Sequence, residues 1–384
     1  MRPACVTDYR ELAKRRLPRV LFDYLDGGSY AEATLRRNVE DFEALALRQR
    51  VMRDVSSISL ETELFGQKLA MPMVLSPIGM GGMYARRGEV QAMKAARGAG
   101  INMCLSSLSI CDVEEVTKDG GAPPWYQLYI IKDRGYMKEL LARVTELGCP
   151  VVAFTVDLPV PGARYRDVRS GLFGAQSPFV PLQRAWDGIT HPGWAWDVMA
   201  MGGPHKFGNL APAIPEAKGV MEFWPWVTKN FDPTLTWKDL DWIRENWKGP
   251  LVIKGILDAD DARECKRYGA DGLIVSNHGG RQLDGVQSGI RALPAIADAV
   301  GDDLTILMDG GVRSGLDVVK ALASGAKGCF IGRAWAWALA GAGQAGVEHV
   351  LQIMRQEMLM AMALTGCTDV RNAGRELLAC DFRG

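Results

Sequence analysis

The stretch LVIKGILDADDARECKRYGADGLIVSN, residues 251–277, contains one complete unit of the pattern that decides the fold. It begins with a short apolar run (251–256), continues through a charged amphipathic segment (258–269), and ends in a second apolar run (272–277). Apolar runs of this length are typical of buried strands, and the segment between them has the period and the terminal glycine of a helix. The unit therefore predicts two parallel strands joined by a helix.

The same alternation extends over most of the chain from Met73 onward. Eight apolar runs predict strands, at 73–77, 101–107, 125–130, 151–157, 251–256, 272–277, 305–311 and 328–333. Amphipathic segments that predict helices follow most of them, among them 88–100, 136–148, 258–269 and 315–325. Eight such units predict an α/β protein with the TIM (β/α)8 barrel fold. We expect residues 1–384 to form a single barrel domain.

Two segments fall outside the eight units. Residues 1–70 include the amphipathic stretch DYRELAKRRLPRVLFDYLDGG (8–28), which predicts a helical cap at one end of the barrel. Residues 158–235 form an insertion between the fourth strand and its predicted helix (236–247), far longer than an ordinary βα loop. It is rich in large apolar residues: Phe179, Trp186, Trp194, Trp196, Met199, Met201, Trp224 and Trp226. We expect this insertion to be either a lid packed on the barrel or a surface that contacts a membrane.

The composition narrows the class of partner. The chain has 384 residues, with 45 basic and 45 acidic side chains, so it offers no net positive field to a nucleic acid. Its eight cysteines have no metal-ligand spacing and are interpreted as reduced core thiols, and no metal site is predicted. The charged N-terminal segment does not resemble a signal peptide, and no stretch is apolar enough to span a bilayer. We expect a cytoplasmic protein with a small-molecule partner.

Polar residues stand at nearly every predicted strand end. In a TIM barrel the active site lies at the C-terminal ends of the strands. These positions hold Ser76, Ser106, Ser107, Gln127, Tyr129, Thr155, Asp157, Lys254, Ser276, Asn277, His278, Asp309 and Arg333. Because buried polar groups require hydrogen-bond partners, this ring predicts a polar ligand inside it.

Two glycine-bearing segments, DGGVRSG (309–315) and IGR (331–333), follow the seventh and eighth strands. Barrels commonly bind a phosphate there through backbone N–H groups, and Arg313 and Arg333 would add positive charge. A dinucleotide-binding fingerprint is excluded in GMGGMYARRG (79–88), because Tyr84 occupies the position of its third glycine. The pattern predicts a phosphate-bearing ligand held by a barrel.

Four side chains suggest chemistry. His278, in SNHGGRQLDG (276–285), is the best-placed general base, and Arg281 beside it can hold a carboxylate. Asp157 can orient the imidazole. Lys254 lies in an apolar strand, where it predicts an anion in the barrel, a Schiff base or a structural ion pair. The other histidines, His191, His205 and His349, are interpreted as structural.

Nine segments carry a resemblance to a known family: DYLDGG, SPIGMGGMYARRGEV, QLYIIKDRG, FTVDLPVPGARYRDVRSG, THPGWAWDV, VIKGILDADDAR, SNHGGRQLDG, DGGVRSGLDVVKAL and FIGRA. On these segments the chain resembles the FMN-dependent 2-hydroxy acid oxidase and dehydrogenase family. The resemblance covers nearly the full chain. Within the family it points to the bacterial members that oxidise L-lactate and reduce a respiratory acceptor.

The resemblance implies a role for each matching residue. FMN would be held by Pro77, Ile78, Gly79, Ser106, Gln127, Thr155, Lys254, Ser276, Asp309, Gly310, Gly311, Arg313, Gly332 and Arg333. Substrate would be held by Tyr24, Tyr129, Arg164 and Arg281. The catalytic residues would be His278, Asp157, Lys254 and Tyr129, with His278 as the base and Asp157 as its partner.

The same resemblance implies oxidation of a small 2-hydroxy acid, most directly L-lactate to pyruvate, with a quinone or other electron acceptor. It also implies a homotetramer or another homo-oligomer. If the insertion is a membrane surface, the protein would lie peripherally on the inner face of the cell membrane. Gly79 stands where oxidases of the family usually carry Ala, which favours a dehydrogenase, and Leu108 stands where glycolate oxidases carry Trp.

Three alternatives remain open at this stage. One is an oxidase of glycolate, lactate or mandelate type that uses O2 and produces hydrogen peroxide. Another is a lyase that uses Lys254 as a Schiff base, and the third is a non-enzymatic barrel that binds a phosphate ligand.

Overall fold

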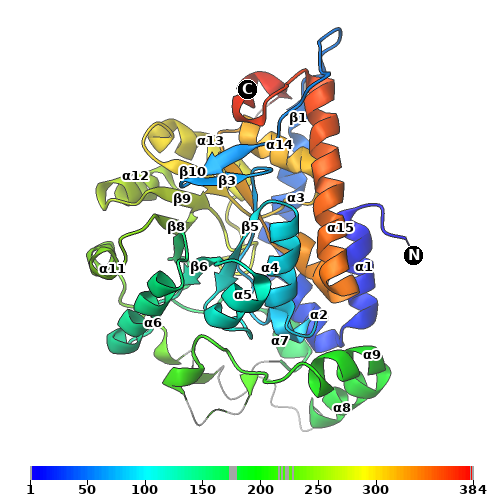
Figure 1. Cartoon of the computed structure of the whole chain (residues 1–384), viewed down its shortest axis with the longest axis vertical. Coiled ribbons are helices and arrows are strands. Elements are labelled where there is room, and N and C mark those ends of the chain that lie inside the picture. Colours follow the sequence, from blue (N-terminus) through cyan, green and yellow to red (C-terminus); the bar gives the residue numbers. More distant parts are fainter. Residues whose placement is uncertain are drawn as a thin grey trace.

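The computed structural model describes residues 2–172, 180–214, 217, 219, 220, 225, 226, 229–380 and 382. Its centre is a closed barrel of eight parallel strands, in which β11 pairs with β4 to complete the circle (Figure 1). The strands are β4 (Met73–Leu75), β5 (Asn102–Ser106), β6 (Trp125–Leu128), β7 (Val152–Thr155), β8 (Leu251–Ile256), β9 (Gly272–Val275), β10 (Thr305–Met308) and β11 (Gly328–Ile331). Each lies within a predicted apolar run, so the predicted TIM barrel is confirmed.

Helices surround the barrel. They are α4 (Gly88–Gly98), α5 (Val113–Gly120), α6 (Arg134–Glu146), α11 (Asp239–Asn246), α12 (Ala259–Arg267), α13 (Gly289–Val300), α14 (Gly315–Ala323) and α15 (Arg333–Thr365). Several begin at a side chain that accepts a hydrogen bond from the first helical turn, including Asp112, Asp133, Asp258 and Ser314. Such caps satisfy backbone N–H groups that have no partner within the helix.

The inside of the barrel is filled at the N-terminal end of the strands. Trp125 and Phe330 pack there, together with the tip of a hairpin formed by β2 (Thr62–Leu64) and β3 (Gln67–Leu69). The indole Nε1 of Trp125 donates to Gln67 Oε1 over 2.7 Å. Because apolar side chains close this end, the space for a ligand lies at the opposite end.

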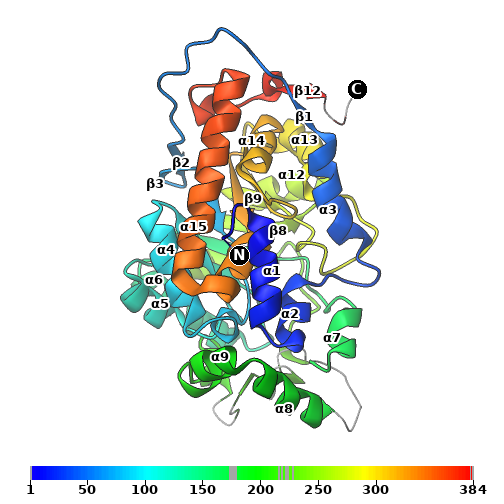
Figure 2. The same ribbon diagram turned by 90° about the vertical axis from the view of Figure 1, so that its right-hand side faces the viewer.

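Part of the first 70 residues forms the predicted helical cap, and the rest lies along the outer helices. Pro18 separates α1 (Val6–Arg16) from α2 (Arg19–Asp26), and α1 lies along α15 (Figure 2). Downstream, α3 (Ala33–Ala44) contacts α13, and β1 (Ala46–Leu47) pairs with β12 (Leu378–Cys380). Since proline cannot continue a helix, the chain turns at Pro18 and only α2 reaches the C-terminal ends of the strands.

The described part of the insertion packs on the barrel. It contains α7 (Tyr165–Arg169), α8 (Val180–Thr190), α9 (Pro192–Trp194), the π-helical turn η2 (Ala195–Ala200) and the 3₁₀ turn η3 (Ala211–Ala213), and α8 and α9 lie at one end of the molecule (Figure 1). Trp194 is buried, and its Nε1 donates to the carbonyl of Met83 over 2.9 Å. Phe207 and Asn209 are also buried. The choice between a lid and a membrane surface stays a prediction, and Phe179 and Trp224 lie outside the described residues.

Six of the eight cysteines are buried, but Cys5 is half-buried and Cys380 is exposed, so the expectation of core thiols is wrong for these two. Both lie near a chain end, where the core does not reach. Within the described ranges, no helix is long and apolar enough to cross a membrane. The same residues contain no group of three or more His, Cys, Asp or Glu side chains that could hold a metal.

Candidate active site

A cavity opens at the C-terminal ends of the barrel strands. It encloses about 1130 Å³, including its open mouth. The predicted residues that line it are Tyr24, Pro77, Ile78, Gly79, Ser106, Gln127, Tyr129, Thr155, Arg164, Lys254, His278, Arg281, Asp309, Gly310, Gly311, Arg313, Gly332 and Arg333. Asp157 and Ser276 do not line it, and each contacts a residue that does. The structure thus brings residues from all eight strand ends and from α2 around one space.

His278 and Asp157 form a hydrogen-bonded pair at this cavity. The imidazole Nδ1 lies 2.9 Å from Asp157 Oδ1, and Nε2 lies 3.4 Å from the Tyr129 hydroxyl. The backbone of His278 is left-handed, with φ +58°, and its N–H donates to Ser276 Oγ over 3.0 Å. A carboxylate at Nδ1 favours the tautomer whose hydrogen is on Nδ1, which leaves the lone pair of Nε2 to accept a proton.

The charges around the pair favour a neutral imidazole. Burial lowers the pKa of His278 below its ordinary value, and Asp157 only partly offsets this, while Lys254 and Arg164 lower the pKa further. Burial alone would raise the pKa of Asp157, but His278 and Lys254 bring it below its ordinary value. At neutral pH the pair is therefore a neutral imidazole beside a carboxylate, which is the state a general base needs.

Lys254 is held as a charged ammonium. Its Nζ lies 2.9 Å from Asp309 Oδ2 and donates to Ser276 Oγ over 2.8 Å. Burial would lower the pKa of Lys254, but Asp309 and Asp157 raise it above its ordinary value. A Schiff base needs a neutral amine, so these contacts disfavour the lyase alternative. The hydroxyl of Ser276, predicted as a cofactor contact, holds Lys254 and the backbone of His278.

Several buried polar atoms of the cavity residues have no hydrogen-bond partner in the part of the chain that the structure describes. They are Ser76 Oγ, Gln127 Nε2, Thr155 Oγ1, Arg164 Nε and Asp309 Oδ1. Each such atom lowers the free energy of unfolding by about 1–3 kcal/mol if it stays unpaired. Because all five belong to residues that line one cavity, a bound ligand with both donors and acceptors would remove this cost.

Two guanidinium groups flank the ring of Tyr24. Arg281 lies 4.8 Å and Arg164 5.6 Å from the ring centre. Arg281 Nη1 also donates to the carbonyl oxygens of Tyr24 and Gly27, over 2.6 and 2.8 Å. Burial lowers the pKa of Arg164, and the charge of Arg281 lowers it further. Two neighbouring cations in a cavity form a site for an anion such as a carboxylate.

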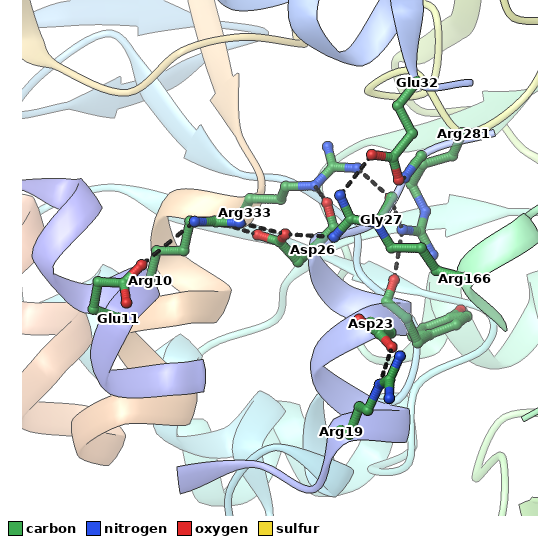
Figure 3. Close-up of polar contacts among 12 residues, drawn as sticks. Arg10, Glu11, Arg19, Asp23, Asp26, Gly27, Glu32, Arg166, Arg281 and Arg333 are labelled. Atoms are coloured by element: carbon green, nitrogen blue, oxygen red, sulfur yellow. Dashed lines mark hydrogen bonds and ion pairs between the residues drawn. The ribbon is translucent and has the colours of Figure 1, made fainter. Parts of the chain in front are cut away.

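Arg333 cross-links α2 to the barrel (Figure 3). Its Nε, Nη2 and Nη1 donate to the carbonyl oxygens of Asp26, Gly27 and Gly279, over 3.2, 2.7 and 2.9 Å. The sequence predicted this side chain as a phosphate contact. A buried guanidinium needs several acceptors, and here backbone carbonyls supply them. Gly310 and Gly311, with φ +86° and +92°, and Arg313 also line the cavity, where the phosphate was predicted.

Asp26 ties α2 to both of its neighbours (Figure 3). Its buried carboxylate accepts from Arg10 Nε and Nη2, over 2.6 and 2.8 Å, and from Arg166 Nη1 over 2.9 Å. Arg10 belongs to α1 and Arg166 to α7. Because Tyr24 stands two residues before Asp26, these ion pairs also fix the position of Tyr24 in the cavity.

We expect Asp26→Asn to lower the free energy of unfolding by about 2 kcal/mol, less than for a fully buried pair because both arginines are partly exposed. Chemical denaturation monitored by tryptophan fluorescence measures this change. The matched control is Glu11→Gln, which removes an exposed partner of Arg10 and should cost under about 1 kcal/mol. Equal losses in the two variants would contradict the role given to Asp26.

The sequence did not single out several residues of the cavity. Tyr84 is buried there and its hydroxyl donates to the Gly79 carbonyl over 3.3 Å, although the sequence used it only to exclude another fold. Phe231, near the end of the insertion, packs on Tyr129 with ring centres 5.3 Å apart. Neither residue ends a barrel strand, and so no positional signal marked them.

The model of the FMN-dependent dehydrogenase family matches residues 13–380. The chain belongs to this family. Among its relatives, the L-lactate dehydrogenase of Caulobacter vibrioides (strain NA1000 / CB15N) is 57% identical over 373 residues, which is 97% of each chain. The L-lactate dehydrogenase of Stenotrophomonas maltophilia (strain K279a) is 56% identical over 372 residues, again 97% of each.

Solved structures agree with this family. The monotopic membrane protein (S)-mandelate dehydrogenase superposes with a TM-score of 0.92 at 32% identity, covering 99% of this chain and 100% of that one. A mandelate oxidase bound to (S)-2-phenylpropionate superposes with a TM-score of 0.81 at 34% identity, covering 98% of each chain.

The cofactor of this FMN-dependent dehydrogenase is FMN. The residues of the cavity fit it. A flavin ring carries both acceptors and a donor, as the unpaired atoms of Gln127, Thr155 and Asp309 require, and a phosphate suits the glycines and arginine at 310–313. The protein is thus a flavoenzyme, and the alternative of a non-enzymatic barrel is excluded.

Proposed function

We propose that this enzyme oxidises an L-2-hydroxy acid, most directly L-lactate to pyruvate, and passes the electrons to a quinone or another respiratory acceptor. The observation that carries the proposal is the His278–Asp157 pair, which faces the same cavity as the two guanidinium groups of Arg164 and Arg281. A base beside a carboxylate site suits a hydroxy acid. Two relatives named L-lactate dehydrogenase support the choice of lactate.

The proposed FMN contacts are those implied by the sequence, with Ser276 acting through Lys254. When bound, FMN accepts the two electrons that leave the substrate. The ammonium of Lys254, fixed by Asp309, provides a positive charge near the place where negative charge develops. Glycines 310 and 311 leave room for the phosphate because they carry no side chain.

We assign the substrate carboxylate to Arg164 and Arg281. Their guanidinium groups can each make two parallel charge-assisted hydrogen bonds, which fix its orientation. The hydroxyls of Tyr24 and Tyr129 bind the polar end of the substrate beside His278. Leu108 also lines the cavity and offers apolar surface to the side chain at C2. This arrangement holds the reacting carbon in one position relative to the base.

His278 would remove a proton from C2 or from the hydroxyl, with Nε2 as the accepting atom. The imidazole then carries a positive charge, and the carboxylate of Asp157, 2.9 Å from Nδ1, stabilises that charge. The proposed role of Asp157 is therefore electrostatic and orienting, and it does not itself take up the proton.

Asp157→Asn should change the pH dependence of substrate oxidation. The base works when neutral, so the rate falls as pH drops through the pKa of His278, which burial places below 6.5. Asp157 raises that pKa, so its neutral replacement should move the acid limb to lower pH. The plateau rate should also fall about 100-fold, because the protonated imidazole loses its partner.

The rate of anaerobic flavin reduction, measured between about pH 4.5 and 8, tests this shift. The range extends below the ordinary pKa of histidine because we expect the pKa of His278 to lie below that value in both enzymes. The neighbouring Asp167→Asn serves as a control, because Asp167 lies beside Arg164 and does not contact His278. An acid limb that moves to higher pH in Asp157→Asn would contradict the proposed pairing.

The choice of a dehydrogenase over an oxidase rests on Gly79. A Cβ at this position would lie 3.3 Å from the carbonyl oxygen and 3.4 Å from the Cβ of Leu108, so an alanine would fit only tightly. To test the choice, L-lactate consumption is followed in air with and without ubiquinone-1. We expect turnover to depend on the quinone. One hydrogen peroxide per pyruvate, with no response to quinone, would favour the oxidase.

We further propose peripheral contact with the inner face of the cell membrane. Leu182, Trp186 and Ile189 are spaced to share one face of α8 and are 69%, 65% and 71% exposed. Trp196 is 69% exposed nearby in η2, and both views place α8 and α9 at one end of the molecule (Figures 1 and 2). A patch of this kind suits a lipid interface. The solved (S)-mandelate dehydrogenase is described as a monotopic membrane protein, which supports the proposal.

The combined variant Leu182→Glu, Trp186→Glu and Ile189→Glu should lose binding to vesicles of bacterial phospholipid, because three carboxylates replace the apolar face. Turnover with soluble ferricyanide should stay within about twofold. Flotation with vesicles measures the binding. Leu316→Glu with Leu364→Glu, both exposed elsewhere, is the control. If the insertion is only a lid, vesicle binding persists and ferricyanide turnover falls.

We also propose a homotetramer or another homo-oligomer in the cytoplasm, as the sequence resemblance implies. Light scattering on the purified enzyme measures the assembly mass, and a monomer at micromolar concentration would contradict it.

A further inference from the structure

A second cavity adjoins the first at the ends of β6, β7 and β8. It encloses about 1200 Å³, including its open mouth. Four residues line both cavities: Tyr129, Thr155, Leu158 and Phe231. A molecule in the second cavity would therefore touch the same side chains as the ligands of the first.

The wall of the second cavity is mainly apolar. It includes Val156, Leu158, Phe231, Leu235, Trp237 and Leu240. The charged side chains among its described lining residues are both acidic, Asp232 and Asp261. Asp232 is paired with Arg134 over 2.9 Å, whereas Asp261 is exposed at the rim. Carboxylates repel anions, so this wall disfavours a second hydroxy acid or a phosphate and suits a neutral apolar ring.

The wall is held in place without a ligand. Phe231 pairs with Ile131 in an antiparallel bridge, and the carbonyl of Asn230 accepts from the Lys132 N–H over 2.9 Å. The indole of Trp237 stacks on Tyr268, with ring centres 6.2 Å apart and planes at 17°. A preformed cavity spares a ligand the cost of ordering its walls.

We propose that this second cavity is the binding site of the electron acceptor and that it takes a neutral quinone ring. The inference rests on the proposed function, which requires an acceptor close to the cofactor. Thr155 lies on the wall between the two cavities, and its Oγ1 is buried with no hydrogen-bond partner among the described residues. A hydroxyl has one hydrogen to donate and two lone pairs to accept, so Thr155 can accept from the flavin and donate to a quinone carbonyl.

The overall step balances. A 2-hydroxy acid that becomes a 2-oxo acid loses two electrons and two protons, one from C2 and one from the hydroxyl. A quinone that becomes a hydroquinone gains two electrons and two protons, so that one O–H bond forms at each carbonyl oxygen. The acceptor site thus consumes what the substrate site releases, and no other oxidant is needed.

Leu235→Trp tests the site, because Leu235 lines the second cavity and not the first. The holoenzyme is photoreduced without air, and its reoxidation by ubiquinone-1 is followed at increasing concentrations. We expect the quinone concentration for half-maximal rate to rise at least about tenfold, because the indole fills the space. Bleaching of the oxidised flavin by L-lactate should stay within about twofold of the unsubstituted enzyme.

Leu364→Trp, on an exposed part of α15, is the matched control and should change neither rate. Leu235→Glu adds a third carboxylate to the wall and should weaken quinone binding in the same direction, which covers the case in which Leu235→Trp does not fold. Photoreduction makes this test independent of the substrate, so a failure of L-lactate to bleach the flavin would speak against the proposed function alone.

Unchanged reoxidation by ubiquinone-1 in both Leu235 variants would overturn the inference. If bleaching of the flavin by 2-hydroxyoctanoate also became slower in these variants, the cavity would be assigned to the side chain of a long substrate.

Discussion

His278→Ala should keep its FMN and lose nearly all reduction of the flavin by L-lactate. The imidazole contacts Asp157 and Tyr129. Apart from Ser276, which acts through Lys254, the proposed cofactor contacts come from other strand ends, so the binding of FMN does not depend on the imidazole. Loss of a general base typically lowers a rate by about 10²- to 10⁴-fold. Anaerobic stopped-flow absorbance at the flavin band measures the rate, and the absorbance of the purified variant measures bound FMN.

The control for this variant is His349→Ala. The Nδ1 of His349 pairs with the Tyr9 hydroxyl over 2.8 Å where α1 packs on α15, away from the cavity. It should bleach at the normal rate. Rapid bleaching of the flavin in His278→Ala by L-lactate would show that His278 is not the base. Loss of FMN from that variant would show that the imidazole helps to bind the cofactor.

Arg281→Lys should raise the KM for L-lactate about 10- to 100-fold, which corresponds to one or two charge-assisted hydrogen bonds. An ammonium cannot form the two parallel bonds that a guanidinium gives a carboxylate. Arg281 uses one nitrogen, Nη1, to hold the carbonyl oxygens of Tyr24 and Gly27, which leaves its other N–H groups for the proposed substrate. An ammonium has a single nitrogen and cannot serve both. Steady-state kinetics with ferricyanide as acceptor measures the change.

Arg169→Lys is the matched control, because Arg169 is exposed on α7 and should tolerate the change with unaltered KM. A KM for L-lactate that Arg281→Lys leaves unchanged would show that Arg281 serves only to fasten α2. Replacement of Arg164 by Lys should then have the larger effect, since its Nε is buried in the cavity wall with no partner.

The barrel and most of its site could be predicted from sequence because both depend on local pattern. Each strand end follows a continuous apolar run, and the C-terminal ends of parallel strands meet at one face. Polar residues such as Gln127, Thr155 and Asp309 were therefore expected to face one space. The structure confirms that they line it and leaves atoms of all three without a hydrogen-bond partner.

Contacts between distant segments could not be predicted in this way. Arg333 lines the cavity as predicted, but its guanidinium also binds the backbone carbonyls of Asp26 and Gly27, more than 300 positions earlier in the chain. The path of residues 1–70 depends on Pro18 and on which outer helix offers an apolar surface to α1. Phe231 lies at the cavity, where its segment pairs with Ile131 in the loop after β6. The periodicity of apolar residues in the sequence does not indicate any of these contacts.

We propose that one cavity brings together FMN, a general base and a carboxylate site for an L-2-hydroxy acid. The most direct test of this proposal is to mix the oxidised holoenzyme with L-lactate in the absence of air and follow the flavin absorbance, with D-lactate in a parallel experiment. We expect L-lactate to bleach the flavin and to yield one pyruvate per FMN, while D-lactate leaves the spectrum unchanged. An FMN-loaded enzyme whose spectrum does not respond to L-lactate would contradict it.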